Sequence, residues 1–188
     1  MKILGELFLY ALVLSSAMFL VSNWQTRDML DNSGGVRVAP LTLPTLPTLP
    51  TRATRATRAT LQSEQTLLAP DPRRNTLIYF FAPWCSICRA SINNLDGIDE
   101  EFTRVVVVAL DYDSTQSVQD FIDDVGLNRP VLLGNSEIQA IFRIKGYPSY
   151  YILDRDFQVI SRDMGYTSEF GLRARAWRAK PDLANKHN

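Results

Sequence analysis

The sequence predicts an α/β fold in which a central mixed β-sheet is flanked by helices. Residues 76–82 and 104–112 are runs of strand length that are apolar almost throughout, a pattern typical of parallel strands buried on both faces. Amphipathic segments of helical period lie between and after these runs, and strand–helix–strand alternation produces parallel β-α-β units. Two later short strands around a turn add antiparallel members, so the expected sheet is mixed.

The composition excludes several classes of function. The 188 residues contain 20 Lys plus Arg and 20 Asp plus Glu. The chain therefore lacks the basic excess of a general nucleic-acid binder, and we expect no nucleic-acid partner. The only histidine is His187, and the only cysteines are Cys85 and Cys88. These counts provide no Cys/His or Ser/His nucleophile pair in a folded core and no four-ligand zinc site within one chain, so we expect no metal and no cofactor.

Residues 1–24 are predicted to form a membrane anchor. Residues 3–24 are apolar with few exceptions, and a spanning helix needs roughly 20 apolar residues. Tyr10 and Trp24 could lie at the depth of the lipid headgroups. We expect an uncleaved single-pass helix with its N-terminus in the cytoplasm. A cleaved signal peptide with a poor cleavage site near Ser15 is the alternative, and a buried soluble helix is disfavoured because no polar face exists.

Residues 25–70 are predicted to be a linker. Residues 43–51 repeat Leu-Pro-Thr and residues 52–60 repeat Arg-Ala-Thr. Proline at every third position suits a polyproline II helix, and the arginine block has no apolar periodicity. We expect a disordered or polyproline II spacer, with contact between its arginines and anionic lipid as the alternative. Residues 181–188 form an uninformative tail.

One folded domain is expected over residues 71–180, which is long enough for a single core. A helix is predicted over 85–102, because apolar residues recur there at spacings of three and four. After the second strand, Ser114 can cap a helix that Gly126 ends.

The second half of this domain continues with short elements. A strand at 131–133 precedes a helix with a capping box at Ser136 and Gln139, which Gly146 is expected to stop. Residues 149–153 and 157–161 then read as a β-hairpin. The last helix, closed by Pro181, carries three apolar residues on one face: Phe170, Ala174 and Trp177.

The Cys-x-x-Cys motif is the strongest chemical signal, because it follows a buried strand and opens a helix. Unpaired N–H groups and the helix dipole at such a position favour the thiolate of Cys85, which is the nucleophile in disulfide exchange. Cys88 lies one turn further, close enough to attack a mixed disulfide at Cys85. We therefore assign Cys85 as the attacking thiol and Cys88 as the resolving thiol of a redox-active disulfide. A purely structural disulfide is disfavoured, since it would close almost no loop.

A second motif, Gly-Tyr-Pro-Ser at residues 146–149, stands directly before a predicted strand. Proline is allowed at the first position of a strand, and its peptide bond could be cis. The plain alternative is a helix stop followed by the start of a strand. Periodicity does not decide between these two interpretations.

The two motifs together resemble the thioredoxin superfamily. The similarity lies in FFAPWCSICRA and GYPSYYILDRDFQVISRDMGY, and it covers about residues 71–180. With the N-terminal anchor and the insert at 130–133, the chain is most similar to membrane-anchored TlpA-like, ResA-like and ScsD-like thiol–disulfide oxidoreductases. The resemblance implies a thioredoxin-like fold in which cis-Pro148 faces the cysteines. It also implies that the Tyr147 backbone pairs with an extended substrate segment, as a strand joins a sheet edge, and that Trp84 borders the groove.

The resemblance also implies a function and a location. We expect a protein thiol–disulfide oxidoreductase, acting as a reductase on exported proteins. It would be tethered to the bacterial inner membrane through residues 3–24, with its folded domain in the periplasm, where disulfides form. A DsbD-like partner would reset the dithiol, and we expect a monomer. Two alternatives stay open: a module that binds Cu(I) through the two thiolates, and a peroxidase that uses Cys85 alone.

Two positions depart from the family pattern. Tyr79 stands where cytoplasmic thioredoxins carry a buried Asp, and Ser91 stands where ResA-like proteins carry a Glu. Neither of the usual carboxylate proton acceptors for the resolving thiol is therefore present. The dipeptide between the cysteines, Ser86-Ile87, also lacks the histidine of strong oxidants, so we expect a reducing or intermediate potential.

Overall fold

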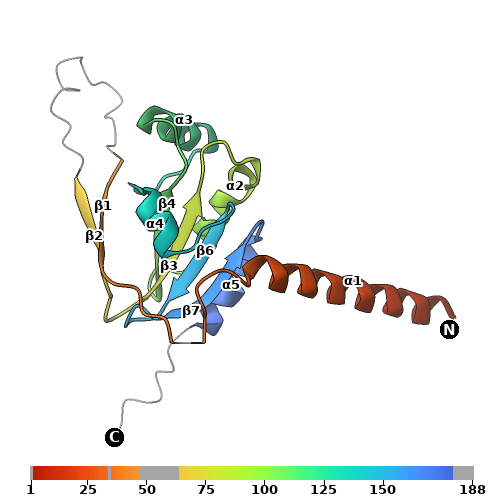
Figure 1. Ribbon diagram of the computed structural model, residues 1–188. Helices are drawn as coiled ribbons and strands as arrows, with labels where there is room; N and C mark the ends of the chain where they lie inside the picture. Colours follow the sequence, from red (N-terminus) through yellow and green to blue (C-terminus); the bar gives the residue numbers. More distant parts are fainter. Residues whose placement is uncertain (1, 34, 47–63, 180–188) are drawn as a thin grey trace, which may run out of the picture.

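The computed structural model describes residues 2–33, 35–46 and 64–179, and its centre is a five-stranded sheet of order β5-β4-β3-β6-β7 (Figure 1). β3 pairs with β4 in parallel, and β4 pairs with β5 in parallel. β6 runs antiparallel to both β3 and β7. The strands are β3 (Asn75–Phe81), β4 (Thr103–Ala109), β5 (Val131–Leu133), β6 (Ser149–Leu153) and β7 (Val159–Met164). The predicted mixed sheet, including the late hairpin, is confirmed.

β3 is the central strand, and every one of its residues is buried. Its aromatic and branched side chains suit a strand covered on both faces. Tyr79 lies opposite Val107 of β4 on one side and Tyr150 of β6 on the other. The strand therefore holds the cysteine motif that follows it in the middle of the domain.

The helix predicted over 85–102 is shorter than expected. α2 (Ser86–Ser91) is followed by a 3₁₀ segment, η2 (Ile92–Gly97). Asparagine side chains favour non-helical partners over the helix ladder. Here Asn93 Nδ2 donates to the Val125 carbonyl at 2.8 Å, and Asn94 Nδ2 donates to the Thr167 carbonyl at 2.9 Å. These two hydrogen bonds connect η2 to the carbonyl groups of residues distant in sequence.

The helix between β4 and β5 agrees with its predicted caps. α3 (Thr115–Val125) has Ser114 as its N-cap, whose side chain accepts from the Ser117 N–H group. It ends at Gly126, which has the left-handed φ of 67° that a glycine adopts without strain.

The capping box predicted at Ser136 is wrong. α4 (Ser136–Ile141) is capped by Asn135, whose side-chain oxygen accepts from the Ile138 N–H group at 3.0 Å. Both residues can cap a helix, and the chain uses the earlier one. The helix also ends well before Gly146, because Arg143 adopts a left-handed φ of 51°.

The apolar stripe predicted for the last helix is not its buried face. In α5 (Glu169–Arg178) the buried residues are Leu172 and Ala176. Phe170 is 82% exposed and Trp177 is 69% exposed. Leu172 and Ala176 are spaced four apart and pack into the core that also holds both cysteines.

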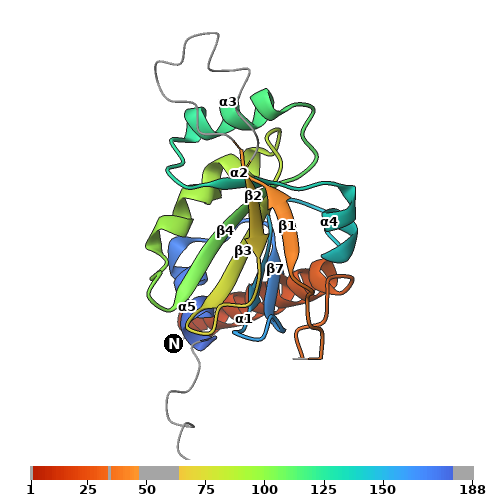
Figure 2. The same ribbon diagram turned by 90° about the vertical axis from the view of Figure 1, so that its left-hand side faces the viewer.

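The prediction of a disordered or polyproline II linker over 25–70 is wrong where the structure describes this segment. β1 (Leu41–Pro44) and β2 (Gln65–Leu68) form an antiparallel hairpin, which lies in front of the sheet in Figure 2. The Val38 N–H group donates to the Phe157 carbonyl, and the Leu46 N–H group donates to the Val131 carbonyl. Five buried side chains pack on the sheet face that α4 covers only in part: Met29, Leu30, Val38, Leu43 and Leu68.

This packing has a simple physical cause. One sheet face needs apolar cover, and irregularly spaced leucines and valines can supply it without any helical or strand periodicity. Leu43 and Pro44 of the first Leu-Pro-Thr repeat therefore belong to β1 instead of a polyproline II helix. The rest of the predicted spacer, including every Arg-Ala-Thr repeat, lies outside the described residues, as does the tail at 181–188.

The N-terminal helix α1 (Lys2–Thr26) extends away from the domain (Figure 1). Its segment Phe8–Thr26 is long and apolar enough to cross a membrane, by length and composition. The chain that follows it is bound to the sheet. The Tyr151 hydroxyl accepts from the Leu30 N–H group at 3.2 Å and donates to the Phe142 carbonyl at 2.6 Å. Arg162 donates to the Met29 carbonyl at 2.8 Å, so α1 leads directly into the folded domain.

Candidate active site

The two cysteines form a disulfide at the start of α2, directly beyond the carboxyl end of β3. Cys85 is the N-cap of α2, and its sulfur accepts a hydrogen bond from the Cys88 N–H group at 3.0 Å. Cys85 is 6% exposed, whereas Cys88 is 0% exposed. Cys85 is therefore the more accessible of the two cysteines, and its role as the attacking thiol stays a prediction. The N–H donor at its sulfur would also stabilise a thiolate there.

The second motif lies beside the first. The Tyr147–Pro148 peptide bond is cis. Ser149, which follows it, pairs with Phe80 near the end of β3, so Pro148 lies at the sheet end where the cysteine motif begins. The rings of Trp84 and Tyr147 meet edge to face, with their centroids 5.7 Å apart. The structure thus brings together all five site residues predicted from the sequence.

Asp111, just beyond β4, is a site residue that sequence reasoning missed. Its carbonyl accepts from Trp84 Nε1 at 2.9 Å, and its carboxylate accepts from the Tyr147 hydroxyl at 3.0 Å. It has a left-handed φ of 47°, which is uncommon outside glycine and best tolerated by Asn and Asp. One residue therefore connects the two aromatic side chains at the site. A polar residue following an apolar strand was the available signal.

Tyr147 is a hydrogen-bond donor at this site. Burial raises its pKa above the usual tyrosine range, and the neighbouring Asp111 carboxylate raises it further. The phenol therefore stays neutral at physiological pH and keeps its proton available for Asp111. This bond fixes the side chain of the residue that precedes cis-Pro148.

Behind the disulfide, the two residues that depart from the family pattern contact each other. The Tyr79 hydroxyl lies 2.9 Å from Ser91 Oγ. Ser91 Oγ donates to the Ile87 carbonyl at 2.7 Å, so Tyr79 is the donor to Ser91. Burial raises the pKa of Tyr79 well above its usual range. A neutral hydroxyl pair thus occupies the positions where thioredoxins or ResA-like proteins carry a carboxylate.

A cavity of about 490 Å³ borders Trp84. Aromatic and acidic side chains line it, among them Tyr112, Phe121, Asp113 and Asp120. Among the described residues, no group of three or more His, Cys, Asp or Glu side chains could hold a metal ion.

Sequence comparison identifies the family. The model of the AhpC/TSA family matches residues 52–162. The thioredoxin-like protein YneN of Bacillus subtilis is 30% identical over 99 residues, which are 50% of this chain and 58% of that protein. The thiol–disulfide oxidoreductase ResA of Oceanobacillus iheyensis is 30% identical over 84 residues, 43% of this chain and 44% of that protein. The chain thus spans about half the length of these relatives.

Solved structures show the same fold at low sequence identity. A putative thiol:disulfide interchange protein DsbE from Chlorobium tepidum superposes with a TM-score of 0.62 at 18% identity, covering 79% of this chain and 99% of that one. StoA from Bacillus subtilis has a TM-score of 0.55 at 19% identity, covering 72% and 95%. The expected thioredoxin-like fold is therefore confirmed, and the chain belongs to the AhpC/TSA family.

Proposed function

We propose that this protein is a thiol–disulfide oxidoreductase that exchanges disulfides with exported proteins through Cys85 and Cys88. The observation that carries the proposal is the disulfide at the start of α2, in which Cys85 alone has an exposed edge. The names of the relatives and of the structural neighbours support the same reaction class.

The proposed reaction runs in the reducing direction. The Cys85 thiolate attacks one sulfur of a substrate disulfide, and the other substrate sulfur leaves as a thiolate that takes up a proton. The Cys88 thiolate then attacks the Cys85 sulfur, breaks the mixed disulfide and releases the second substrate thiol. Two electrons pass from the dithiol to the substrate, and the protons of both cysteines end on the substrate thiols. The observed Cys85–Cys88 disulfide is the product state.

Substrate binding is assigned to the groove beside the disulfide. An extended segment would pair with the Tyr147 backbone next to cis-Pro148, in the manner of an added strand. Trp84, which is 67% exposed, would border that segment. Asp111 contacts no sulfur in this scheme. It would act by holding both aromatic side chains in place.

The surroundings of the dithiol support the reducing direction of electron flow. Ser86 and Ile87 carry no charge that would stabilise the Cys85 thiolate further, which favours a reducing or intermediate potential. A measured potential as oxidising as about −120 mV would contradict the reductase assignment. The oxidised protein would then need a second dithiol donor, of the DsbD class, to return it to the reduced state.

The location is the inner membrane of a bacterium, with the folded domain in the periplasm. α1 supports a single-pass anchor by its length and composition. The periplasm is an oxidising compartment in which exported proteins carry disulfides, so a tethered reductase has substrates there. We propose that the protein acts there as a monomer.

Partner trapping tests the exchange mechanism. Cys88→Ser in the full-length, membrane-bound protein should accumulate mixed disulfides through Cys85, visible as adducts on non-reducing gels that disappear with dithiothreitol. The double variant Cys85→Ser/Cys88→Ser is the matched control and should give none. Absence of reducible adducts from Cys88→Ser would count against exchange. Sustained peroxide turnover by Cys88→Ser would favour the peroxidase alternative, and one tightly held Cu(I) per chain without exchange would favour the metal module.

A further inference from the structure

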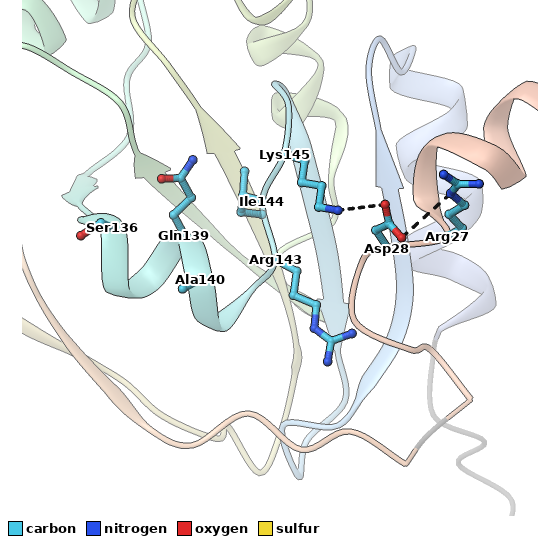
Figure 3. Close-up of a pocket in the computed structure, with 8 residues that line it drawn as sticks. All are labelled: Arg27, Asp28, Ser136, Gln139, Ala140, Arg143, Ile144 and Lys145. Carbon is cyan, nitrogen blue, oxygen red and sulfur yellow. Dashed lines mark hydrogen bonds and ion pairs between the residues drawn. The ribbon is translucent and has the colours of Figure 1, made fainter.

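A cationic pocket lies where α1 meets the domain. Figure 3 shows its lining residues on α4, on the α4–β6 connection and just after α1, and its volume is about 600 Å³. Its polar lining consists of Arg27, Asp28, Ser136, Gln139, Arg143 and Lys145.

Positive charge dominates this lining, because three cationic side chains share one carboxylate. Lys145 Nζ lies 2.8 Å from Asp28 Oδ2, and Arg27 Nε lies 3.9 Å from Asp28 Oδ1. The Lys145 hydrogen bond holds the pKa of Asp28 below its usual range, and Arg27 and Arg143 act in the same direction. The charge of Asp28 is therefore already balanced. Arg143 makes no ion pair with the described part of the chain, so the pocket carries excess positive charge.

The pocket also lies next to the end of α1, which fixes its position relative to the helix. Arg27 directly follows α1, and its guanidinium lies over the Trp24 ring, 5.3 Å from the centroid. Trp24 is 63% exposed on the last turns of the helix. Tryptophan concentrates at the level of lipid headgroups, and arginine and lysine pair with their phosphates. An anchored α1 therefore places this pocket at headgroup depth.

We propose that this pocket binds the phosphate of an anionic phospholipid headgroup. The proposal rests on the membrane anchor of the proposed function. Arg143 and Lys145 are the principal phosphate partners, and Arg27 supports them from the end of α1. Free inorganic phosphate shares this chemistry, but the position of the pocket beside the end of α1 favours the lipid. The bound headgroup would fix the domain against the membrane on the α4 side.

Lipid retention tests this site on the full-length chain. The protein is placed in nanodiscs of phosphatidylcholine with phosphatidylglycerol, and the lipids that stay bound after release from the disc are counted by native mass spectrometry. The wild-type chain should retain phosphatidylglycerol in preference to phosphatidylcholine, and Arg143→Gln/Lys145→Gln should lose this preference. Arg173→Gln/Arg178→Gln, which removes two exposed cations from α5, is the matched control and should keep it.

Each other outcome has a definite meaning. Equal retention by the Arg143→Gln/Lys145→Gln variant and the wild type overturns the site while leaving the anchor intact. Loss of phosphatidylglycerol from the wild type on addition of inorganic phosphate at millimolar concentration overturns the lipid assignment in favour of a soluble anion. Failure of the wild-type chain to enter the discs overturns the anchor itself, and the exchange activity of Cys85 and Cys88 is measured separately.

Discussion

The two faces of the five-stranded sheet are covered by different kinds of structure. The face with the disulfide is covered by regular elements, which are α2, η2, α3 and α5. The other face is covered by α4 together with Met29, Leu30, Val38 and Leu43 from the chain after α1, and with Leu68 of β2. Tyr150 and Tyr151 are neighbours on β6 and belong to opposite faces: Tyr150 shares a core with Cys88, and Tyr151 shares a core with Leu30.

This difference shows that a segment without secondary-structure periodicity can be an integral part of a core. The catalytic face, which is the face with the disulfide, holds the groups to which the proposed exchange is assigned. The other face binds the chain that emerges from α1, chiefly through buried leucines and the Tyr151 hydroxyl. Attachment of the chain after α1 therefore lies on one face, and the disulfide lies on the other. Variants on each face should separate these properties.

The largest expected effect comes from Leu43→Ala on the non-catalytic face. Leu43 is 3% exposed in β1. Truncating a buried leucine removes about 2–5 kcal/mol from the free energy of unfolding. Leu67→Ala in β2 is the matched control, because Leu67 is 60% exposed and its loss should change stability by less than about 0.5 kcal/mol. Urea unfolding of the full chain in detergent measures both values. Equal unfolding midpoints for the two variants would show that β1 does not pack on the sheet.

Tyr151→Phe should have the next largest effect. The variant loses the acceptor for the Leu30 N–H group and the donor to the Phe142 carbonyl. Leaving these buried groups without a partner lowers the free energy of unfolding by about 1–3 kcal/mol. Limited proteolysis within residues 28–46 should also become faster than in the wild type. Unchanged cleavage there would mean that this hydroxyl does not hold the segment.

Tyr151 also makes the stability of the wild-type protein depend on pH in the alkaline range, and Tyr151→Phe removes this dependence. Burial raises the pKa of Tyr151 to about 12, whereas an unfolded tyrosine titrates near ~10. Above pH ~10 the unfolded state loses this proton and the folded state keeps it. Stability therefore falls as pH rises towards 12, by about 1.4 kcal/mol per pH unit. The difference in stability between wild type and Tyr151→Phe should be constant below pH ~10 and shrink above it.

Substitutions at Asp111 on the catalytic face should change substrate binding more than turnover. Asp111→Gly keeps the carbonyl that accepts from Trp84 and tolerates the left-handed φ, but loses the bond to Tyr147. One hydrogen bond of ~1 kcal/mol corresponds to an increase of about fivefold in KM for a disulfide peptide, with kcat unchanged. Asp111→Asn keeps an acceptor and should restore a KM near the wild-type value. A KM that does not change in Asp111→Gly would exclude this positioning role.

The smallest effect is expected for Tyr79→Phe behind the disulfide. Ser91 keeps its bond to the Ile87 carbonyl, so only one hydrogen bond of about 0.5–1.5 kcal/mol is lost. The rate at which Cys88 resolves a mixed disulfide should not change, because the neutral Tyr79 hydroxyl is no proton acceptor at pH 7. Stopped-flow measurement of that step provides the test. A slower step in the Phe variant would show that the hydroxyl pair takes part in proton transfer.

Much of the catalytic face could be predicted from sequence, because local chemistry determines it. The strands at 75–81 and 103–109 are recognisable from continuous apolar runs, and the ends of α3 from Ser114 and Gly126. The position of the cysteine pair follows from the strand before it and the helix after it. Asp111 was missed because its partners, Trp84 and Tyr147, are 27 and 36 residues away in sequence.

The other face could not be predicted in the same way. Whether Leu43 is buried depends on which sheet face the helices leave uncovered. The sequence around Leu43 contains no pattern that indicates which face this is. The cap of α4 shows the same limit on a smaller scale. Asn135 and Ser136 are both good caps, and the choice depends on where α4 packs through Ile138 and Phe142.

The firm attachment of the chain after α1 also determines where the dithiol can work. The Leu30 backbone is bonded to Tyr151 and Arg162, so no flexible linker separates α1 from the sheet. With α1 anchored as proposed, the domain would rotate about the membrane normal and diffuse laterally, but it would stay close to the bilayer. Cys85 would then stay at a nearly constant distance from the bilayer surface. It would react only with substrate disulfides that come within this distance of the membrane, such as those of newly exported chains and of other membrane-bound proteins.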